Sequence, residues 1–125
     1  MEKGRAGKVL RIAIVGPCGS GKTTLALDLQ ARGLDARQIV QEHSFVPEMW
    51  QLITRPDLLI FLDASHSVCN QRKNLGWSRE EHAEQLRRLE HARQHCNLYV
   101  HTDSLSPDEV FELTWRYLSE QRLVP

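Results

Sequence analysis

Residues 9–29, VLRIAIVGPCGSGKTTLALDL, decide the fold of this chain of 125 residues. They begin with a nearly unbroken run of β-branched and aliphatic side chains, which is typical of a strand covered on both faces in a parallel sheet. A glycine-rich loop follows at Gly16. From Lys22 the apolar residues take helical spacing until Arg32-Gly33, which indicate a helix end. The stretch therefore predicts a strand, a tight loop and a helix.

The loop of residues 16–23 has the composition of a phosphate cradle. Backbone N–H groups that converge at a helix N-terminus bind phosphates, and glycines let the backbone come close. In such a loop Lys22 reaches the β- and γ-phosphates, and the Thr23 hydroxyl is a ligand for Mg²⁺. We therefore expect a bound nucleoside triphosphate with Mg²⁺. The residues expected to contact it are Gly16, Cys18, Gly19, Ser20, Gly21, Lys22, Thr23 and Thr24.

The remaining chain continues to alternate between strands and helices. Further strands are expected over residues 37–42, 58–62 and 97–102, and helices over 47–53, 66–74, 78–95 and 106–118. Ser78 with Glu81, and Ser106 with Glu109, have the spacing of capping boxes. The order predicts an α/β three-layer sandwich with about four parallel strands. We expect one domain over residues 1–125, with a flexible segment at 1–7.

Helical spacing also predicts which side chains the two capped helices bury. The inner face of the first is expected to carry Ala83, Leu86, Leu89 and Ala92, and that of the second Val110, Phe111, Thr114, Trp115 and Leu118.

Composition excludes several classes of partner. Sixteen basic and sixteen acidic residues cancel, so no global field attracts nucleic acid or an anionic membrane. Three widely spaced cysteines do not make a secreted disulfide framework, and no apolar stretch approaches the roughly 20 residues that span a bilayer. We expect a cytoplasmic protein that binds neither nucleic acid nor membrane.

Several motifs resemble the small nucleotide and metabolite kinases of the P-loop NTPase superfamily. GPCGSGKTT, residues 16–24, looks like their Walker A loop. Residues 59–74, with IFLDAS and a following basic helix, are similar to the lid-base region of dephospho-coenzyme A kinase, shikimate kinase and nucleoside kinases. LGWSREEHAE, residues 75–84, resembles the lid of dephospho-coenzyme A kinases. NLYVHTDSLSPDEVFELTWRYL, residues 97–118, is like the last strand and helix of shikimate and gluconate kinases, whose connecting loop borders adenine.

The resemblance implies an ATP-dependent phosphotransferase with the P-loop NTPase fold. Lys22 would hold the phosphates, while Arg72, Lys73 and Arg79 would be lid cations that neutralise the transferring phosphoryl group. ATP is preferred over GTP because no Asn-Lys-x-Asp motif follows an expected strand.

P-loop enzymes also hold Mg²⁺ through a carboxylate at the end of a strand beside the loop. Glu42, in IVQEHSF, is expected to end the second strand and to hold Mg²⁺ directly or through water. By resemblance to nucleoside kinases it could instead be the base that accepts the hydroxyl proton. Asp63, at the end of the third strand, is the competing candidate.

One departure from the kinases concerns the acceptor. They place a larger segment between the first helix and the IFL strand, whereas here only residues 33–57 separate them. The acceptor site is therefore small, altered, or completed by another chain, which includes a homodimer. The alternative to an enzyme acting on a small-molecule acceptor is a non-catalytic nucleotide-binding module that regulates or binds a protein partner.

Three further features carry weaker hypotheses. Cys18 is a small residue tolerated in the loop or, with a pKa lowered by the helix N-terminus, a redox switch. His91, His95 and Cys96 lack a fourth zinc ligand at a familiar spacing, so a solvated face is preferred. Trp77 is the tryptophan that could touch a ligand.

Overall fold

The computed structural model describes residues 10–74 and 76–124. The expected flexible segment 1–7, the beginning of the expected first strand at Val9, and Leu75 lie outside the described residues. The elements are β1 (Arg11–Val15), α1 (Lys22–Ala31), β2 (Asp35–Gln38), the 3₁₀ turn η1 (Gln41–His43), α2 (Met49–Thr54), β3 (Leu58–Asp63), α3 (His66–Lys73), α4 (Arg79–His95), β4 (Leu98–His101) and α5 (Pro107–Glu120).

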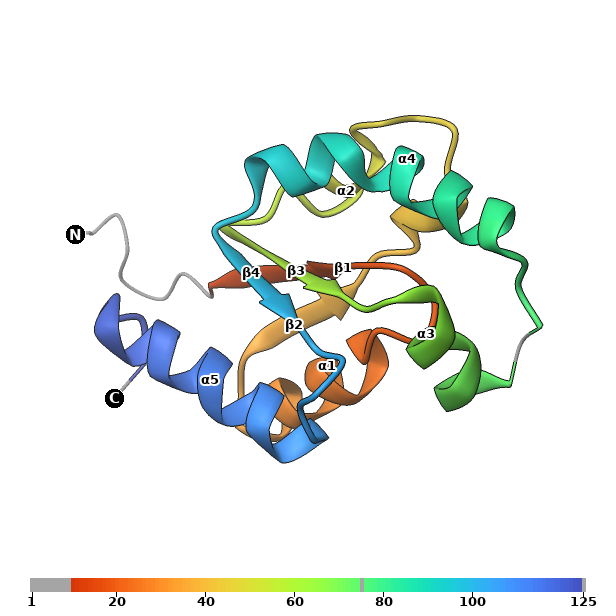
Figure 1. Ribbon diagram of the computed structural model, residues 1–125. Helices are drawn as coiled ribbons and strands as arrows, with labels where there is room; N and C mark the ends of the chain where they lie inside the picture. Colours follow the sequence, from red (N-terminus) through yellow and green to blue (C-terminus); the bar gives the residue numbers. More distant parts are fainter. Residues whose placement is uncertain (1–9, 75, 125) are drawn as a thin grey trace.

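The four strands form one parallel sheet in the order β2-β1-β3-β4. Helices α1 and α5 cover one face, and α2 and α4 cover the other (Figure 1). This arrangement confirms the expected three-layer α/β sandwich. Because all strands run in the same direction, the segments that leave β1, β2, β3 and β4 meet at one edge of the sheet.

The side chains of β1 point alternately to the two faces of the sheet, and each face carries its own hydrophobic core. Ile12 and Ile14 point to the layer of α1 and α5, where they pack with Leu29 and Leu118 among others. Ala13, by contrast, belongs to the second core, with β3, α2 and α4. Both faces of the strand are buried, as its continuous apolar sequence predicted.

The second strand differs from the expectation in its bounds. It was expected over residues 37–42, but β2 covers Asp35–Gln38 and Glu42 lies beyond it in η1. The last ladder bond joins the Ile39 N–H to the Ile14 carbonyl at 2.9 Å. Beyond this point β1 turns into the glycine loop, so the chain after Ile39 has no strand to pair with and folds into a 3₁₀ turn instead.

Both capping boxes form, at Ser78 with Glu81 and at Ser106 with Glu109, and they begin α4 and α5 as predicted. The buried faces differ in part. On α4, Leu89 and Ala92 are buried and Leu86 packs against the same core as expected, but His82 and Gln85 are also buried and Ala83 is half-buried. On α5, Val110, Thr114 and Leu118 are buried as expected, and the half-buried Phe111 and Trp115 pack against the core beneath the Arg32 guanidinium.

Removing a side chain from the α5 core tests this packing. Leu118 is 0% exposed, so Leu118→Ala should lower the free energy of unfolding by about 2–5 kcal/mol. Leu52, which is 65% exposed on α2, provides the matched control, and Leu52→Ala should change it by less than about 0.5 kcal/mol. Urea denaturation of both variants measures the difference. Equal effects would contradict the assigned layers.

Candidate functional site

Residues 16–23, here called the phosphate loop, connect β1 to the first turn of α1, and at Gly16 and Gly19 the surrounding backbone leaves no space for a side chain. A Cβ on Gly16 would lie 2.0 Å from the backbone oxygen of Leu62 in β3. A Cβ on Gly19, which has φ +87°, would lie 2.7 Å from the backbone oxygen of Cys69 in α3. The loop therefore packs backbone against backbone on two neighbouring elements, which holds its N–H groups at the N-terminus of α1.

Lys22 is buried, with 6% of its surface exposed, and its ammonium group is fully engaged. It donates to the carbonyl oxygens of Gly16 at 2.6 Å and Pro17 at 3.3 Å. It also forms an ion pair with Glu42 through Oε2 at 2.7 Å. The lysine thus closes the phosphate loop on itself and connects it to η1.

Glu42 is 2% exposed, and only one of its carboxylate oxygens is occupied. Oε2 accepts from Lys22, and the Cys18 thiol donates to the same oxygen at 3.5 Å. Oε1 is buried and has no hydrogen-bond partner among the described residues. A buried acceptor without a donor is unfavourable, so this oxygen is a binding position for a donor or a cation.

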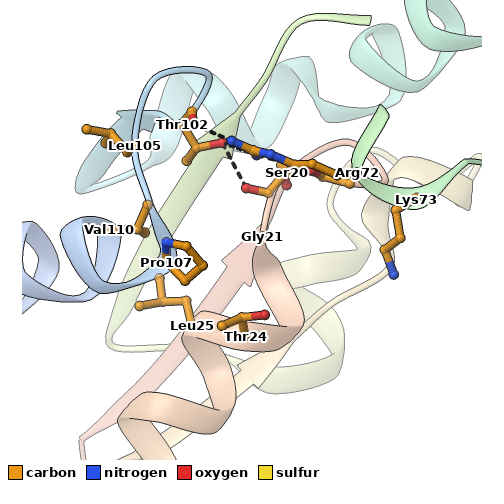
Figure 2. Close-up of a pocket in the computed structure, with 11 residues that line it drawn as sticks. Ser20, Gly21, Thr24, Leu25, Arg72, Lys73, Thr102, Leu105, Pro107 and Val110 are labelled. Atoms are coloured by element: carbon orange, nitrogen blue, oxygen red, sulfur yellow. Dashed lines mark hydrogen bonds between the residues drawn. The ribbon is translucent and has the colours of Figure 1, made fainter. Parts of the chain in front are cut away.

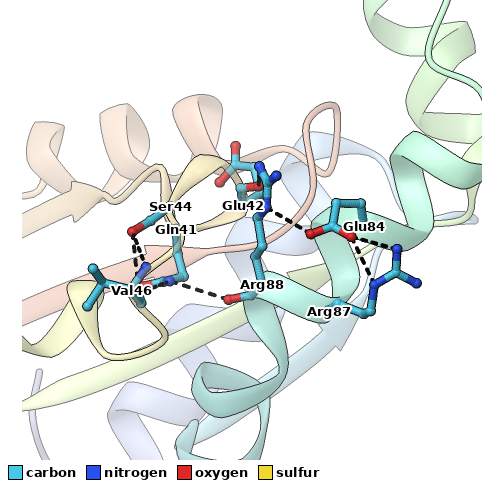
Figure 3. A network of polar contacts seen from close by, with 7 residues as sticks. All are labelled: Gln41, Glu42, Ser44, Val46, Glu84, Arg87 and Arg88. Carbon is cyan, nitrogen blue, oxygen red and sulfur yellow. Dashed lines mark hydrogen bonds and ion pairs between the residues drawn. The ribbon is translucent and has the colours of Figure 1, made fainter.

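The turn that carries Glu42 is fixed by its neighbour Gln41, which is 0% exposed. Its amide group donates to the carbonyl oxygens of Val46 at 2.8 Å and Arg88 at 3.3 Å, and its oxygen accepts from the Trp50 N–H at 2.8 Å. Figure 3 shows the bonds of Gln41 to Val46 and to Arg88. Gln41 therefore attaches η1 to α4.

Arg88 adds a second connection between the same elements. Its guanidinium donates to the Glu42 carbonyl oxygen at 3.5 Å and to Glu84 Oε2 at 3.1 Å (Figure 3). Hydrogen bonds from Arg87, together with the weaker effect of Arg88, lower the pKa of Glu84. The carboxylate stays ionised and keeps the Arg88 side chain directed along α4.

Asp63, the competing carboxylate, is engaged elsewhere. Its Oδ1 accepts from the Ala64 N–H at 2.9 Å, and its Oδ2 accepts from the Tyr99 hydroxyl at 2.5 Å. Burial and this bond to a carboxylate raise the pKa of Tyr99 to about 12. Asp63 lines neither of the two cavities at the phosphate loop, so Glu42 is the carboxylate that faces it.

One cavity lies between the phosphate loop, α3 and the β4–α5 connection and has a volume of about 230 Å³. We call it the α5-side cavity. Figure 2 shows Leu105, Pro107 and Val110 on one side of it and Arg72 and Lys73 on the other. Its lining residues are Gly19, Ser20, Gly21, Thr24, Leu25, Arg72, Lys73, Thr102, Leu105, Pro107 and Val110.

The second cavity lies on the other side of the loop and measures about 450 Å³. We call it the Glu42-side cavity. Gly19, Gly21, Thr24 and Lys73 line both cavities, so the loop and one lysine separate them. The lining residues of the Glu42-side cavity are Cys18, Gly19, Gly21, Lys22, Thr23, Thr24, Gln38, Val40, Glu42, His43, Lys73 and Trp77.

Arg72 is held in place by protein contacts. It donates to Thr102 Oγ1 at 2.8 Å, to the Thr102 carbonyl oxygen, and to the Gly19 carbonyl oxygen at 3.3 Å. Thr102 in turn donates to the Ser20 carbonyl oxygen at 2.9 Å. The guanidinium is therefore a wall of the α5-side cavity. Lys73 is exposed and borders both cavities, whereas Arg79 is exposed in the first turn of α4 and lines neither.

The surroundings of Cys18 do not lower the pKa of its thiol, as the redox-switch hypothesis requires. Burial and the nearby Glu42 carboxylate raise the pKa of its thiol. Its backbone N–H donates to Gln85 Oε1 at 3.0 Å, and its sulfur lies 3.2 Å from His43 Nε2. The helix N-terminus therefore does not produce a reactive thiolate here.

Sequence analysis did not single out Gln41, His43, Gln85 or Thr102. Gln41 and His43 flank Glu42, so a search for polar side chains around that residue could have found them. Gln85 meets Cys18 across 67 residues of sequence, and Thr102 meets Ser20 across 82. No local pattern signals such contacts.

The sequence profile of the AAA domain family matches residues 12–101, well over half of the chain. The chain belongs to the AAA domain family. The match extends from β1 to the end of β4, so the phosphate loop, Glu42 and Arg72 all lie within it. With the parallel sheet, it supports a P-loop fold that binds nucleotide. No curated protein matches the sequence.

In this AAA domain, no helix among the described residues combines the length and apolarity needed to span a bilayer.

The close approach of the phosphate loop to β3 can be tested by adding one methyl group. Gly16→Ala should lower the free energy of unfolding by about 3 kcal/mol or more, because only a shift of the backbone relieves the overlap. A Cβ on Gly33, at φ +85°, meets nothing within 4 Å, so Gly33→Ala should carry only the positive-φ penalty of about 1–2 kcal/mol. Chemical denaturation gives both values; a larger effect at Gly33 would refute the loop geometry.

Proposed function

We propose that this AAA domain binds Mg-ATP across the phosphate loop and transfers the terminal phosphoryl group to a small acceptor in the Glu42-side cavity. The observation that carries the proposal is that one loop forms a wall of two cavities, of which only the Glu42-side cavity is lined by Lys22 and Glu42. A nucleotide whose phosphates lie on the loop would extend into one of them and present its reacting end to the other.

The α5-side cavity suits a planar base. Leu25, Leu105 and Val110 supply apolar contacts, and the Arg72 guanidinium supplies a flat cationic surface. Bases stack on such surfaces, and Arg72 is already oriented by Thr102. The sequence resemblance also implies that the loop before α5 borders adenine.

The residues of the phosphate loop fit a magnesium triphosphate. The loop lies at the N-terminus of α1, whose positive end favours negative charge, and its remaining backbone N–H groups would donate to phosphate oxygens. Lys22 would exchange its carbonyl acceptors for phosphate oxygens, and the exposed Thr23 hydroxyl would be a metal ligand. When bound, Mg-ATP supplies the phosphoryl group.

Glu42 would act on the acceptor side through its unpartnered oxygen. Two roles fit a buried carboxylate that borders the cavity: it holds Mg²⁺, directly or through water, or it accepts the proton of the attacking hydroxyl. Lys73 borders both cavities and is the lid cation best placed to neutralise the transferring group, whereas Arg72 belongs with the base. Arg79 would need to approach from solvent.

A second candidate function is a nucleotide-binding module without turnover. The segment between α1 and β3 exposes apolar side chains, with Phe45 at 84%, Leu52 at 65% and Ile53 at 63%. This is the segment that in the kinases carries the acceptor helices. Such exposed side chains favour a protein partner or a second copy of this chain in place of a small acceptor.

Lys22→Ala should weaken ATP binding at least about tenfold, because it removes the one buried cation of the phosphate loop. Isothermal titration with Mg-ATP measures this, and Arg116→Ala, an exposed position on α5, is the control expected to bind normally. ADP release is then followed over a panel of nucleosides, nucleotides and small metabolites. Acceleration by one acceptor supports the kinase, binding without acceleration supports the module, and no binding rejects both.

Arg72→Ala tests whether Arg72 contacts the base or the phosphates of ATP. ATP affinity should fall by about tenfold, the scale of one stacking contact, while affinity for inorganic tripolyphosphate should change by less than about threefold. Both ligands are titrated against the same two proteins. If tripolyphosphate loses as much affinity as ATP, then Arg72 acts on the phosphates and the base assignment is wrong.

A further inference from the structure

Cys18, Glu42 and His43 bring a sulfur, a carboxylate and an imidazole together at the mouth of the Glu42-side cavity. The Cys18 sulfur lies 3.5 Å from Glu42 Oε2 and 3.2 Å from His43 Nε2, and Nε2 lies 3.9 Å from the same carboxylate oxygen. Ligand atoms of the three residues all lie within 4.8 Å of one another. Among the described residues this is the one such group that could hold a metal ion.

These separations are close to those of a tetrahedral zinc site. With ordinary zinc bonds to sulfur, nitrogen and oxygen, neighbouring ligand atoms stand about 3.3–3.6 Å apart. Lys22 occupies Oε2, so the Glu42 carboxylate would turn to offer Oε1, and small rotations of the other two side chains would bring the three atoms to a common ion. Three protein ligands leave a fourth position open, and all three residues line the Glu42-side cavity, so this position would be accessible from it.

A second observation points to a ligand at the same place. Glu42 is 2% exposed, yet Oε1 has no partner within the described chain. Lys22 neutralises part of the carboxylate charge through Oε2 and leaves Oε1 available. A cation bound here would satisfy a buried acceptor that is otherwise left without one.

The ligands are also held by the surrounding structure. The Cys18 backbone is fixed to Gln85, and η1 is fixed to α4 by the Gln41 amide. The His43 ring packs near Trp77, with ring centroids 6.2 Å apart. Binding therefore needs little ordering of the chain, which favours affinity.

We propose that Cys18, Glu42 and His43 form a site for a thiophilic divalent ion of the Zn²⁺ class. Thiolate and imidazole select such ions over Mg²⁺, which prefers oxygen ligands. Of the two magnesium ligands proposed above, Thr23 lies outside this site, and Glu42 would be shared between the two sites. On coordination the thiol releases its proton to solvent. The ion would connect the phosphate loop to η1 at the mouth of the cavity.

The competing group of His91, His95 and Cys96 is less suited. His91 Nδ1 accepts from the Trp50 indole N–H at 3.2 Å, and the Cys96 thiol donates to the Arg93 carbonyl oxygen at 3.2 Å. The His91 and His95 rings stack with centroids 4.2 Å apart. Among the described residues these three do not form a group of ligand atoms that could hold an ion, as Cys18, Glu42 and His43 do. Cys96→Ser is therefore the matched control for a cysteine outside the proposed site.

Titration of the full chain with Co²⁺, in excess Mg²⁺ and without nucleotide, tests the proposal. The wild type should develop a near-ultraviolet thiolate-to-cobalt absorption band at one ion per chain, and Zn²⁺ should displace it. Cys18→Ser should abolish the band and Cys96→Ser should keep it. His43→Asn and Glu42→Gln should weaken binding at least about tenfold. His43 is 45% exposed, so its variant should fold even if changes at Cys18 do not.

Thermal unfolding provides a second readout. Saturating Zn²⁺ should raise the midpoint of the wild type and of Cys96→Ser, but not of His43→Asn, because an ion that binds the folded state stabilises it. No cobalt band in the wild type, a band that survives in Cys18→Ser, or a band lost in Cys96→Ser would overturn the proposal.

Discussion

The ammonium group of Lys22 is the charge around which the site is organised. A cation with 6% exposure remains ionised inside a protein only when acceptors surround it, and here these are two carbonyl oxygens of its own loop and the Glu42 carboxylate. The bonds to Gly16 and Pro17 require the loop to curl over the first turn of α1. The bond to Glu42 requires the segment after β2 to turn toward that loop. One buried charge thus determines two connections of the sheet.

The carboxylate that balances this charge is positioned by residues outside the phosphate loop. Gln41 and Arg88 attach η1 to α4 through contacts that span 47 and 46 residues of sequence, and Gln85 of the same helix accepts from the phosphate loop. The face of α4 near the loop is therefore polar where helical periodicity favoured alanine and leucine. This departure from an apolar inner face is the form that a functional site takes in a small domain, where the same helix covers the core and orients ligands.

The two cavities lie on two sides of the phosphate loop and differ in the side chains that line them. On the α5 side, apolar side chains and an oriented guanidinium favour a flat, weakly polar group. On the other side, Lys22, Glu42 and His43 favour charged and metal-binding groups. The short segment between α1 and β3 exposes apolar side chains, of which Phe45 is the most exposed, and Val40 of this segment lines the second cavity. The two candidate functions differ in what binds there: a small acceptor in the kinase, and a protein partner in the nucleotide-binding module.

Sequence alone determined the features that depend on neighbours in the chain. The buried β1, the glycine loop, the beginning of α1 and the capping boxes at Ser78 and Ser106 follow from apolar runs, φ preferences and i to i+3 hydrogen bonds, all of which are local. They were sufficient to predict the three-layer fold and to select Lys22 and Glu42 as candidates.

Tertiary structure decided where those candidates meet their partners. The end of β2 depends on where β1 stops offering hydrogen bonds, so Glu42 lies in a 3₁₀ turn and not at a strand end. Arg72 meets Thr102, and Cys18 meets His43, only because parallel strands bring their carboxyl ends to one edge of the sheet. Residue type and spacing cannot encode such contacts, since they depend on sheet order and on the packing of helices against both faces.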